Sequence, residues 1–288
     1  MQRYRCLTCS AQCQSARRPV RRRAQLRKRY VWQRQTLWQL AEAANRSVPW
    51  VRKQLDASSP AGRAHAPELI VIIADTTFWG RGYGLTVFRS PARKQNLWWQ
   101  EVEHERMATY ALGRREIEAR GWTIAAAVVD GRRGFTGVFG DIPLQMCHFH
   151  QMKRVTTYLT RRPKTEAGRA LREVMLMLPA SDERSFTHAL GSWYGTWSGF
   201  IAERTYHDDG VHWHYTHRNV RSAYLSMKRN LQYLFTYERY PDLAIPTTTN
   251  SLDGMFTQLK NRLAVHRRLR RDRRYRMIGD ILAGGDDS

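Results

Sequence analysis

Two short apolar runs in this chain each end directly at an aspartate. Residues 69–74 (LIVIIA) precede Asp75, and residues 124–129 (IAAAVV) precede Asp130. Runs of branched or small apolar residues of this length predict strands that are buried on both faces of a sheet. We expect an acid that follows such a strand to be held rigidly at the edge of the sheet, where a hard cation such as Mg²⁺ can reach it.

The segments around the two runs predict the other elements of the same sheet. Valine and aromatic residues favour two further strands, and Gly121 is expected to end a helix before the second run. The expected elements are strands at 69–75, 82–89, 95–101 and 123–129, helices at 105–120, 134–140 and from about 148, and an apolar strand at 142–146. The order β-β-β-α-β-α-β-α describes a ribonuclease H-like mixed sheet, an α/β fold, with both acids at the ends of central strands.

Changes in composition divide the chain into five expected segments. Proline and small residues mark a linker near 57–62, and aromatic residues cluster in a helical region after 160. The segments are a basic arm with partial zinc-ribbon-like cysteines at 1–30, a helix-turn-helix module at 31–57, the catalytic core at 66–160, a helical insertion at 161–245, and a final catalytic helix with a basic C-terminal tail at 246–288. The first segment is expected to be an arm or a partial module, because its arginines repel one another and no apolar period appears.

The helix-turn-helix prediction depends on two short helical patterns joined at 44–47. Ser47 is expected to cap the second helix, whose polar side carries Trp50, Arg52 and Lys53. Such a helix fits the major groove of double-stranded DNA. An ordinary helical hairpin is the alternative, because no glycine marks the turn.

The charge of the chain points to a polyanionic partner. Lys and Arg number 48 against 25 Asp and Glu, which makes the formal net charge +23. No apolar stretch approaches the roughly 18–20 residues of a membrane-spanning helix, and the N-terminus lacks a signal-peptide core. We therefore expect a cytoplasmic protein without a membrane partner.

A third acid, Asp253, lies in the first turn of a helix that is expected to follow the capping sequence TTTNS. Three carboxylates can hold two metal ions that activate an attacking oxygen and stabilise a leaving one. The alternative is that each aspartate merely caps a turn or a helix. The basic run after this helix, with Arg262, Arg267 and Arg268, is placed to hold phosphates, although such runs are often only solvated faces.

The cysteines and histidines predict no complete metal site. Cys6 and Cys9 supply half the ligands of a zinc ribbon, so a remnant or an intermolecular zinc site is expected rather than a site in this chain alone. Cys147 and His150 have zinc-ligand spacing, but a buried packing cysteine beside a surface histidine is the simpler interpretation. The histidines within 207–217 are expected to be solvated or stacked.

Four segments together resemble the bacterial insertion-sequence transposases of the Mutator-like type. They are IADTTFWG with Asp75, VVDGRRG with Asp130, LQMCHFHQMKRV with Cys147 and His150, and TTTNSLDGMFTQLKNRL with Asp253. The resemblance covers about residues 65–275. It implies a ribonuclease H-like fold with a helical insertion, and three acids that use two Mg²⁺ ions, or Mn²⁺ as a substitute, to cut transposon ends and join them to target DNA.

The resemblance also implies that Cys147 and His150 are a family mark near the active site, and that the protein works in the bacterial cytoplasm on the nucleoid. Because two ends must be paired, it implies at least a dimer. The third acid of the family is usually glutamate, whereas this chain has Asp253, which is one methylene shorter. The first zinc knuckle has no counterpart, as expected of a truncated copy or of a chain that starts late.

Two other functions fit the same residues. A structure-specific, Mg²⁺-dependent DNA nuclease would use the acids without strand transfer. A domesticated DNA-binding regulator would keep binding and lose catalysis. The intact acids argue against the regulator, and the predicted end-recognition module argues against a plain nuclease.

Overall fold

The computed structural model describes residues 3–5, 7–10, 12–14, 17–57, 67–266 and 269–284. Contacts between Cα atoms divide the chain into two compact units. Residues Ala66–Asp253 form one unit, and Met1–His65 together with Gly254–Ser288 form the other. The division groups the C-terminal residues with the N-terminal helices, a grouping that the sequence did not predict. Each unit is described by itself.

A five-stranded mixed sheet is the centre of the larger unit. Its strands are β3 (Leu69–Phe78), β4 (Gly84–Ser90), β5 (Gln95–Val102), β6 (Thr123–Val129) and β7 (Leu144–Met146). They lie in the order β5-β4-β3-β6-β7, with β3 in the middle. The first three strands pair antiparallel, whereas β6 pairs parallel with β3 and β7 parallel with β6. The α/β class and the mixed sheet expected from the sequence are confirmed.

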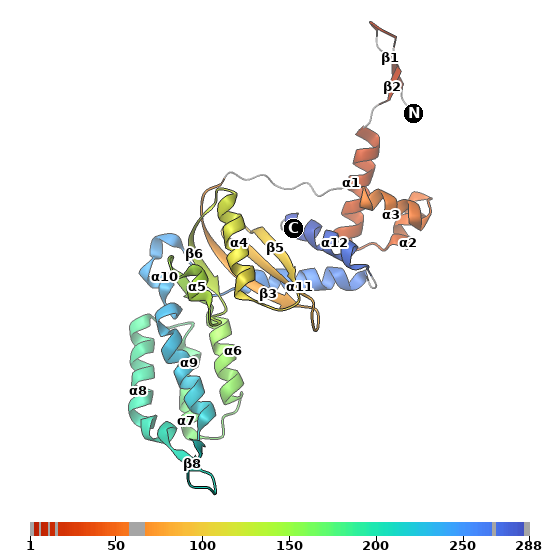
Figure 1. Cartoon of the computed structure of the whole chain (residues 1–288). Helices are drawn as coiled ribbons and strands as arrows, with labels where there is room; N and C mark the ends of the chain where they lie inside the picture. The colour runs from red at the N-terminus through yellow and green to blue at the C-terminus, as the bar shows by residue number, and fades with distance from the viewer. Residues whose placement is uncertain are drawn as a thin grey trace. The chain divides into compact units, whose positions relative to one another are not determined.

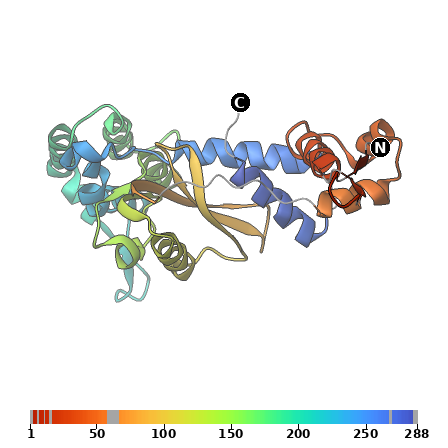
Figure 2. The same ribbon diagram turned by 90° about the horizontal axis from the view of Figure 1, so that it is seen from above.

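Helices α4 (Met107–Ala119) and α5 (Phe135–Phe139) cover one face of this sheet, as both ribbon views show (Figures 1 and 2). Their fully buried aromatic rings pack against strand residues. Phe88 of β4 contacts Tyr110, Trp98 and Phe139, with ring centroids 5.3–6.2 Å apart. Tilted and edge-to-face aromatic pairs at this separation are favourable beyond their burial. This aromatic core holds α4 against one face of the sheet, close to the ends of the strands.

A helical bundle beside the sheet has a core of its own. It comprises α6 (His148–Leu159), α7 (Glu166–Met177), α8 (Glu183–Ala202) and α9 (Arg218–Leu234), followed by α10 (Thr236–Arg239) and the 3₁₀ turn η1 (Pro241–Leu243). Side chains from all four longer helices share one buried cluster, including Leu171, Phe186 and Met227. The helical region expected after residue 160 contains α7 and α8. The hairpin β8 (Arg204–Tyr206) and β9 (Trp213–Tyr215) and helix α9 were not predicted.

Helix α11 (Asn250–Val265) begins where the third acid was expected, and the division between the two units falls within it, after Asp253. Its first turn is tied to the sheet. The buried Arg89 of β4 donates from Nε to Ser251 Oγ at 2.9 Å and from Nη1 to Asn96 Oδ1 at 3.0 Å. A buried guanidinium must have such partners, so the position of this first turn is coupled to β4.

The other unit contains the short hairpin β1 (Arg3–Arg5) and β2 (Gln12–Gln14), then α1 (Arg17–Val31), α2 (Leu37–Ala44), α3 (Val48–Asp56) and α12 (Arg271–Ala283). Both helix starts expected in the helix-turn-helix module are capped. Thr36 and Gln39 form a reciprocal capping box on α2, and Ser47 accepts from the N–H of Trp50 at the start of α3. The turn between the two helices contains no glycine, and Asn45 instead takes the left-handed conformation that ends α2.

The second half of the segment at 1–30, where no apolar period was found in the sequence, is helical. Residues Arg17–Val31 form a helix in which Leu26, Tyr30 and Val31 are buried. Tertiary packing of these few apolar side chains outweighs the repulsion among the arginines. Likewise, the basic tail contains helix α12, with Met277, Ile278, Ile281 and Leu282 buried on one side. Among the described residues, none of the helices combines the length and the apolar character needed to cross a membrane.

Candidate active site

The two aspartates that follow the apolar runs lie side by side in register. Strands β3 and β6 are parallel, and Ile73 is the partner of Val128. Asp75 and Asp130 each lie two residues beyond this pair. The expectation that Asp75 ends its strand is wrong, because β3 continues to Phe78 and pairs Asp75 with Val87 of β4. The sheet thus holds Asp75 on one side by β4, while its other side opens where β6 has ended.

The third predicted acid is linked to this edge through Thr249, which is fully buried just before α11. The Thr249 hydroxyl lies 3.4 Å from Asp253 Oδ2 and 3.4 Å from His150 Nδ1. The backbone N–H of Thr249 donates to Cys147 Sγ at 3.3 Å. One threonine therefore contacts members of two of the predicted motifs.

The Cys147-x-x-His150 motif joins the end of β6 to the start of α11. The N–H of Cys147 donates to Val129 O at 2.8 Å, and that of His148 donates to Thr247 O at 2.9 Å. Cys147 is fully buried, as expected of a packing cysteine, but His150 is partly buried and is not a surface histidine. The motif is thus a connector between the acid-bearing segments.

Burial and neighbouring charges strongly shift the pKa of Asp75, which is only 9% exposed. Burial is the largest cause that raises its pKa to about 7, and the charges of Asp130 and Asp253 raise it further. The charge of His150 and the Thr76 N–H, which donates to Oδ1 at 2.7 Å, act in the opposite direction. Asp130 and Asp253 therefore each lie close enough to Asp75 to repel its negative charge.

His150 is the nearby group of opposite charge. Burial lowers its pKa, but the hydrogen bond with Cys147 and the charges of Cys147, Asp75 and Asp130 outweigh burial and raise the pKa to about 9. Burial raises the pKa of the Cys147 thiol, but the hydrogen bonds from His150 and Thr249 lower it by more, so the pKa is below its ordinary value. A protonated imidazole here offsets part of the negative charge of the aspartates.

A fourth carboxylate, Glu105, was missed by the sequence reasoning. Burial raises the pKa of Glu105, and Tyr110 donates its hydroxyl to Oε1 at 2.8 Å. Arg132 joins Glu105 to the edge of the sheet: its Nη1 lies 2.9 Å from Glu105 Oε2, and its N–H donates to Asp130 Oδ1 at 2.9 Å. Glu105 precedes α4 in a charged stretch, so no pattern separated it from solvated neighbours. We call Asp75, Asp130, Asp253 and Glu105 the acidic cluster.

The acidic cluster offers the right kind of ligand for Mg²⁺ but does not form a closed cage. Within the described part of the chain, no three side chains of His, Cys, Asp or Glu are grouped so that they could hold a metal ion. All the acidic donors are carboxylate oxygens, which hard divalent cations prefer. Their mutual repulsion, evident in the raised pKa of Asp75, is what a divalent cation would relieve.

The other candidate metal ligands lie in the N-terminal cysteine segment and in the histidine-rich segment of the insertion. Cys9 is exposed and free, and Cys6 lies outside the described residues. In the histidine-rich segment, His217 stacks on Phe200 with ring centroids 3.5 Å apart, and His207 Nε2 faces His214 Nδ1 at 3.4 Å. These positions agree with the expected stacking of the histidines, and the two zinc predictions stay untested.

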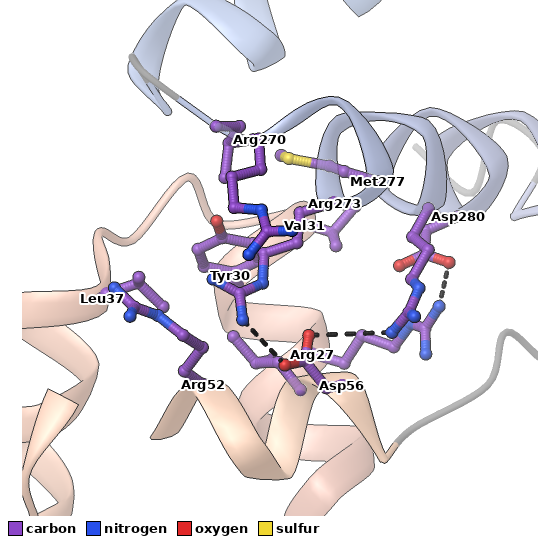
Figure 3. Close-up of a pocket in the computed structure, with 13 residues that line it drawn as sticks. Arg27, Tyr30, Val31, Leu37, Arg52, Asp56, Arg270, Arg273, Met277 and Asp280 are labelled. Carbon is purple, nitrogen blue, oxygen red and sulfur yellow. Dashed lines mark hydrogen bonds and ion pairs between the residues drawn. The ribbon is translucent and has the colours of Figure 1, made fainter. Parts of the chain in front are cut away.

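The predicted DNA-contacting residues of α3 differ in their surroundings. Lys53 and Arg52 are exposed, whereas Trp50 is partly buried under Arg22, whose guanidinium carbon lies 4.8 Å from the ring. Arg52 also lines a cavity of about 310 Å³ in the smaller unit (Figure 3). Of the basic run, Arg262 lies over Trp32 at 4.6 Å, and Arg267 and Arg268 are outside the described residues.

The cavity is lined by residues of α1, α2, α3 and α12 and of the segment before α12, and charged pairs cross it (Figure 3). Arg27 pairs with Asp280, and Arg273 Nη2 lies 3.0 Å from Asp56 Oδ2. These pairs connect α12 to the N-terminal helices. The helix-turn-helix pattern is therefore part of a larger helical unit that includes the C-terminal helix α12.

No family model and no curated protein matches this chain. Any assignment of function therefore depends on the geometry of the acidic cluster and on the charge around it.

Proposed function

We propose that this protein is a DNA transposase whose acidic cluster cuts and joins DNA strands with the help of Mg²⁺. The observation that carries the proposal is the register of Asp75 and Asp130 on neighbouring parallel strands, with Asp253 close enough to raise the pKa of Asp75. The strong positive charge of the chain supports a polyanionic substrate.

A ribonuclease H-like fold is part of the proposal. The strand order β5-β4-β3-β6-β7, with three antiparallel strands followed by two parallel ones, supports it. The helical bundle between β7 and α11 corresponds to the insertion that the resemblance implies. In such sheets, functional side chains gather at the carboxyl ends of parallel strands, and Asp130 follows the end of β6 directly.

In this proposal, Asp75, Asp130 and Asp253 would hold the cations, and Glu105 would orient Arg132 beside them. Two Mg²⁺ ions, when bound, would activate the attacking oxygen and stabilise the leaving oxygen. Hydrolysis breaks one P–O bond at the transposon end and leaves a free 3′-hydroxyl. That hydroxyl then attacks a phosphate of the target DNA, forms a new P–O bond and releases the target's own 3′-hydroxyl.

The residues around the cluster have supporting roles. Arg132 and the protonated His150 place positive charge beside the carboxylates and would attract the DNA backbone. The smaller unit, with Lys53 and Arg52 exposed on α3, would bind the duplex at the transposon ends. A homodimer or larger assembly would pair two such ends.

Cleavage and joining of labelled DNA test the proposal. Duplexes taken from the DNA that flanks the coding sequence would be incubated with the full chain, Mg²⁺ or Mn²⁺, and a supercoiled target plasmid. We expect joined product that is lost in Asp130→Ala and kept in Asp208→Ala, a control at an exposed aspartate in the insertion. Cleavage without joining would instead indicate the nuclease, binding alone the regulator, and an active Asp130→Ala variant would refute the site assignment.

A further inference from the structure

A second cavity lies beside the acidic cluster, in the same unit. It encloses about 190 Å³ between the loop that follows Asp130, helix α6 and helix α9 of the insertion. Gly131, the residue after Asp130, forms part of its wall. Gly131 has a φ of +74°, a conformation that residues with a Cβ rarely adopt, so another side chain would strain the loop at this wall of the cavity.

The cavity is positively charged and contains no acid. Four arginines line it, Arg132, Arg133, Arg154 and Arg229, and none of its lining residues is Asp or Glu. Arg132 is already paired with Glu105. Among the described residues, no carboxylate lies within ion-pairing distance of the other three, although Arg154 donates to Gly131 O and Arg229 to Leu225 O. Three guanidinium groups around one hollow thus keep donors for an anion.

The floor of the cavity is apolar. Val129, Phe135, Leu144 and Met146 line it, and the partly buried Tyr233 of α9 lies at its side. A ligand that fits must carry negative charge at one end and an apolar face at the other. A nucleotide has both, with its phosphate for the arginines and its base or sugar for the floor.

The size of the cavity favours one unit of a longer strand over a free small molecule. Small-molecule sites usually enclose about 300–1,000 Å³, which is more than this cavity holds. A nucleotide within a DNA strand need not be enclosed completely, because the neighbouring nucleotides of the strand also hold it in place. Since Gly131 adjoins Asp130, that nucleotide would be close to the bond that is cut.

We propose that this cavity binds one nucleotide of the DNA strand next to the scissile phosphate, with its phosphate on Arg133, Arg154 and Arg229. This inference rests on the proposed DNA-cutting function and deepens it, because it assigns the α9 segment of the helical insertion a direct contact with substrate. Arg154 would act in addition as a positioning residue, since it also holds the carbonyl of Gly131.

Binding measurements on the full chain test this proposal. The pocket variant is Arg133→Ala with Arg229→Ala, at two exposed side chains whose removal leaves the core intact. The control is Arg161→Ala with Arg162→Ala, at two exposed arginines after α6 that line neither cavity. These two substitutions remove the same amount of positive charge as those of the pocket variant. Fluorescence anisotropy with fluorescein-labelled flanking duplexes, without Mg²⁺, gives Kd over a range of salt concentrations.

We expect the pocket variant to bind at least about tenfold more weakly and to reduce the salt slope by about two, whereas the control stays close to the wild type. Replacing one phosphate at a time by a neutral methylphosphonate should weaken binding by the wild type most strongly at one position. At that position the pocket variant should show no further loss, because the contact is already absent.

These measurements distinguish a failure of the pocket inference from a failure of the proposed function. If the pocket variant binds like the control while the wild type still cuts DNA, the pocket inference is wrong and the proposed function stands. If the methylphosphonate effect is spread evenly over all positions, the single-nucleotide site is likewise refuted. If the wild type binds no DNA, both proposals fail.

Discussion

Thr249 donates its backbone N–H to the sulfur of Cys147 at 3.3 Å, across 102 residues of sequence. Its hydroxyl lies within 3.5 Å of Cys147 Sγ, His150 Nδ1 and Asp253 Oδ2. The helical insertion lies between the two residues in the chain, so this contact closes the loop that the insertion forms. It couples the third acid to the edge of the sheet that carries the other two.

Removing the Thr249 hydroxyl should therefore impair catalysis more than stability. We expect Thr249→Ala to cost only about 1 kcal/mol of unfolding free energy, because each hydroxyl contact is long. DNA cleavage should fall by at least about tenfold, as misplaced catalytic groups lose rate steeply. Thr205→Ala, which removes the exposed Thr205–Thr216 hydroxyl pair of the hairpin, is the control and should alter neither. Equal cleavage by both variants would refute the coupling.

The raised pKa of Asp75 predicts the direction of a pH effect on stability. The folded pKa of about 7 exceeds the ordinary value of 3.8, so the folded state holds the proton more tightly. The stability that this adds is present below about pH 4 and is lost as the pH rises to about 7, by up to about 4 kcal/mol. Without Mg²⁺, Asp75→Asn should thus melt above the wild type at pH 8 and show a flatter pH profile.

Mg²⁺ gives a second readout for the same variant. The wild-type Tm should rise when Mg²⁺ is added at pH 8, because a bound cation stabilises the folded state by mass action and relieves the repulsion. Asp75→Asn should show a smaller rise. A variant that melts below the wild type at pH 8, or that gains as much from Mg²⁺, would contradict the role given to this carboxylate.

The bundle core predicts a contrast within helix α7. Leu171 is fully buried among residues of α8 and α9, whereas Leu176 is 43% exposed on the same helix. Leu171→Ala should destabilise the protein by about 2–5 kcal/mol through lost burial and a cavity. Leu176→Ala should change the unfolding free energy by less than about 1 kcal/mol. Urea denaturation followed by circular dichroism measures both, and similar midpoints would argue against a packed bundle.

Helix α3 predicts an electrostatic contact with duplex DNA. Lys53 is exposed on the face expected to meet the duplex, so Lys53→Ala should weaken binding and lower the salt slope by about one. The matched control is Lys164→Ala, at an exposed lysine before α7. Kd values measured over a salt series decide the matter. A loss of affinity of the same size in the control would mean that only overall charge matters.

Local patterns were sufficient to predict most of the sheet. The run at 124–129 lies within β6 (Thr123–Val129), and strands or helices were expected close to β3, β4, β5, α4, α5 and α6. The predicted Ser47 cap also placed the start of α3. These elements were predictable because burial on both faces, or a cap beside an apolar period, leaves a signal within a few residues.

Other elements left no such local signal. Helix α1 was missed because arginines surround its three buried apolar residues, and α9 because cations interrupt the spacing of Val220, Ala223 and Met227. Their stability comes from neighbours distant in sequence, α12 in one case and α6 to α8 in the other. Propensity alone cannot register contacts of this kind.

The sequence by itself determined that Asp75 and Asp130 follow buried strands, because the apolar runs and the acids are adjacent in the chain. Only the tertiary structure decided that the two are in register, that Thr249 links Asp253 to Cys147 and His150, and that Glu105 joins them through Arg132. The physical reason is that strand pairing and the desolvation of charges depend on which segments meet in space. Contacts between segments that are distant in sequence set the pKa of Asp75, so no single segment determines that pKa.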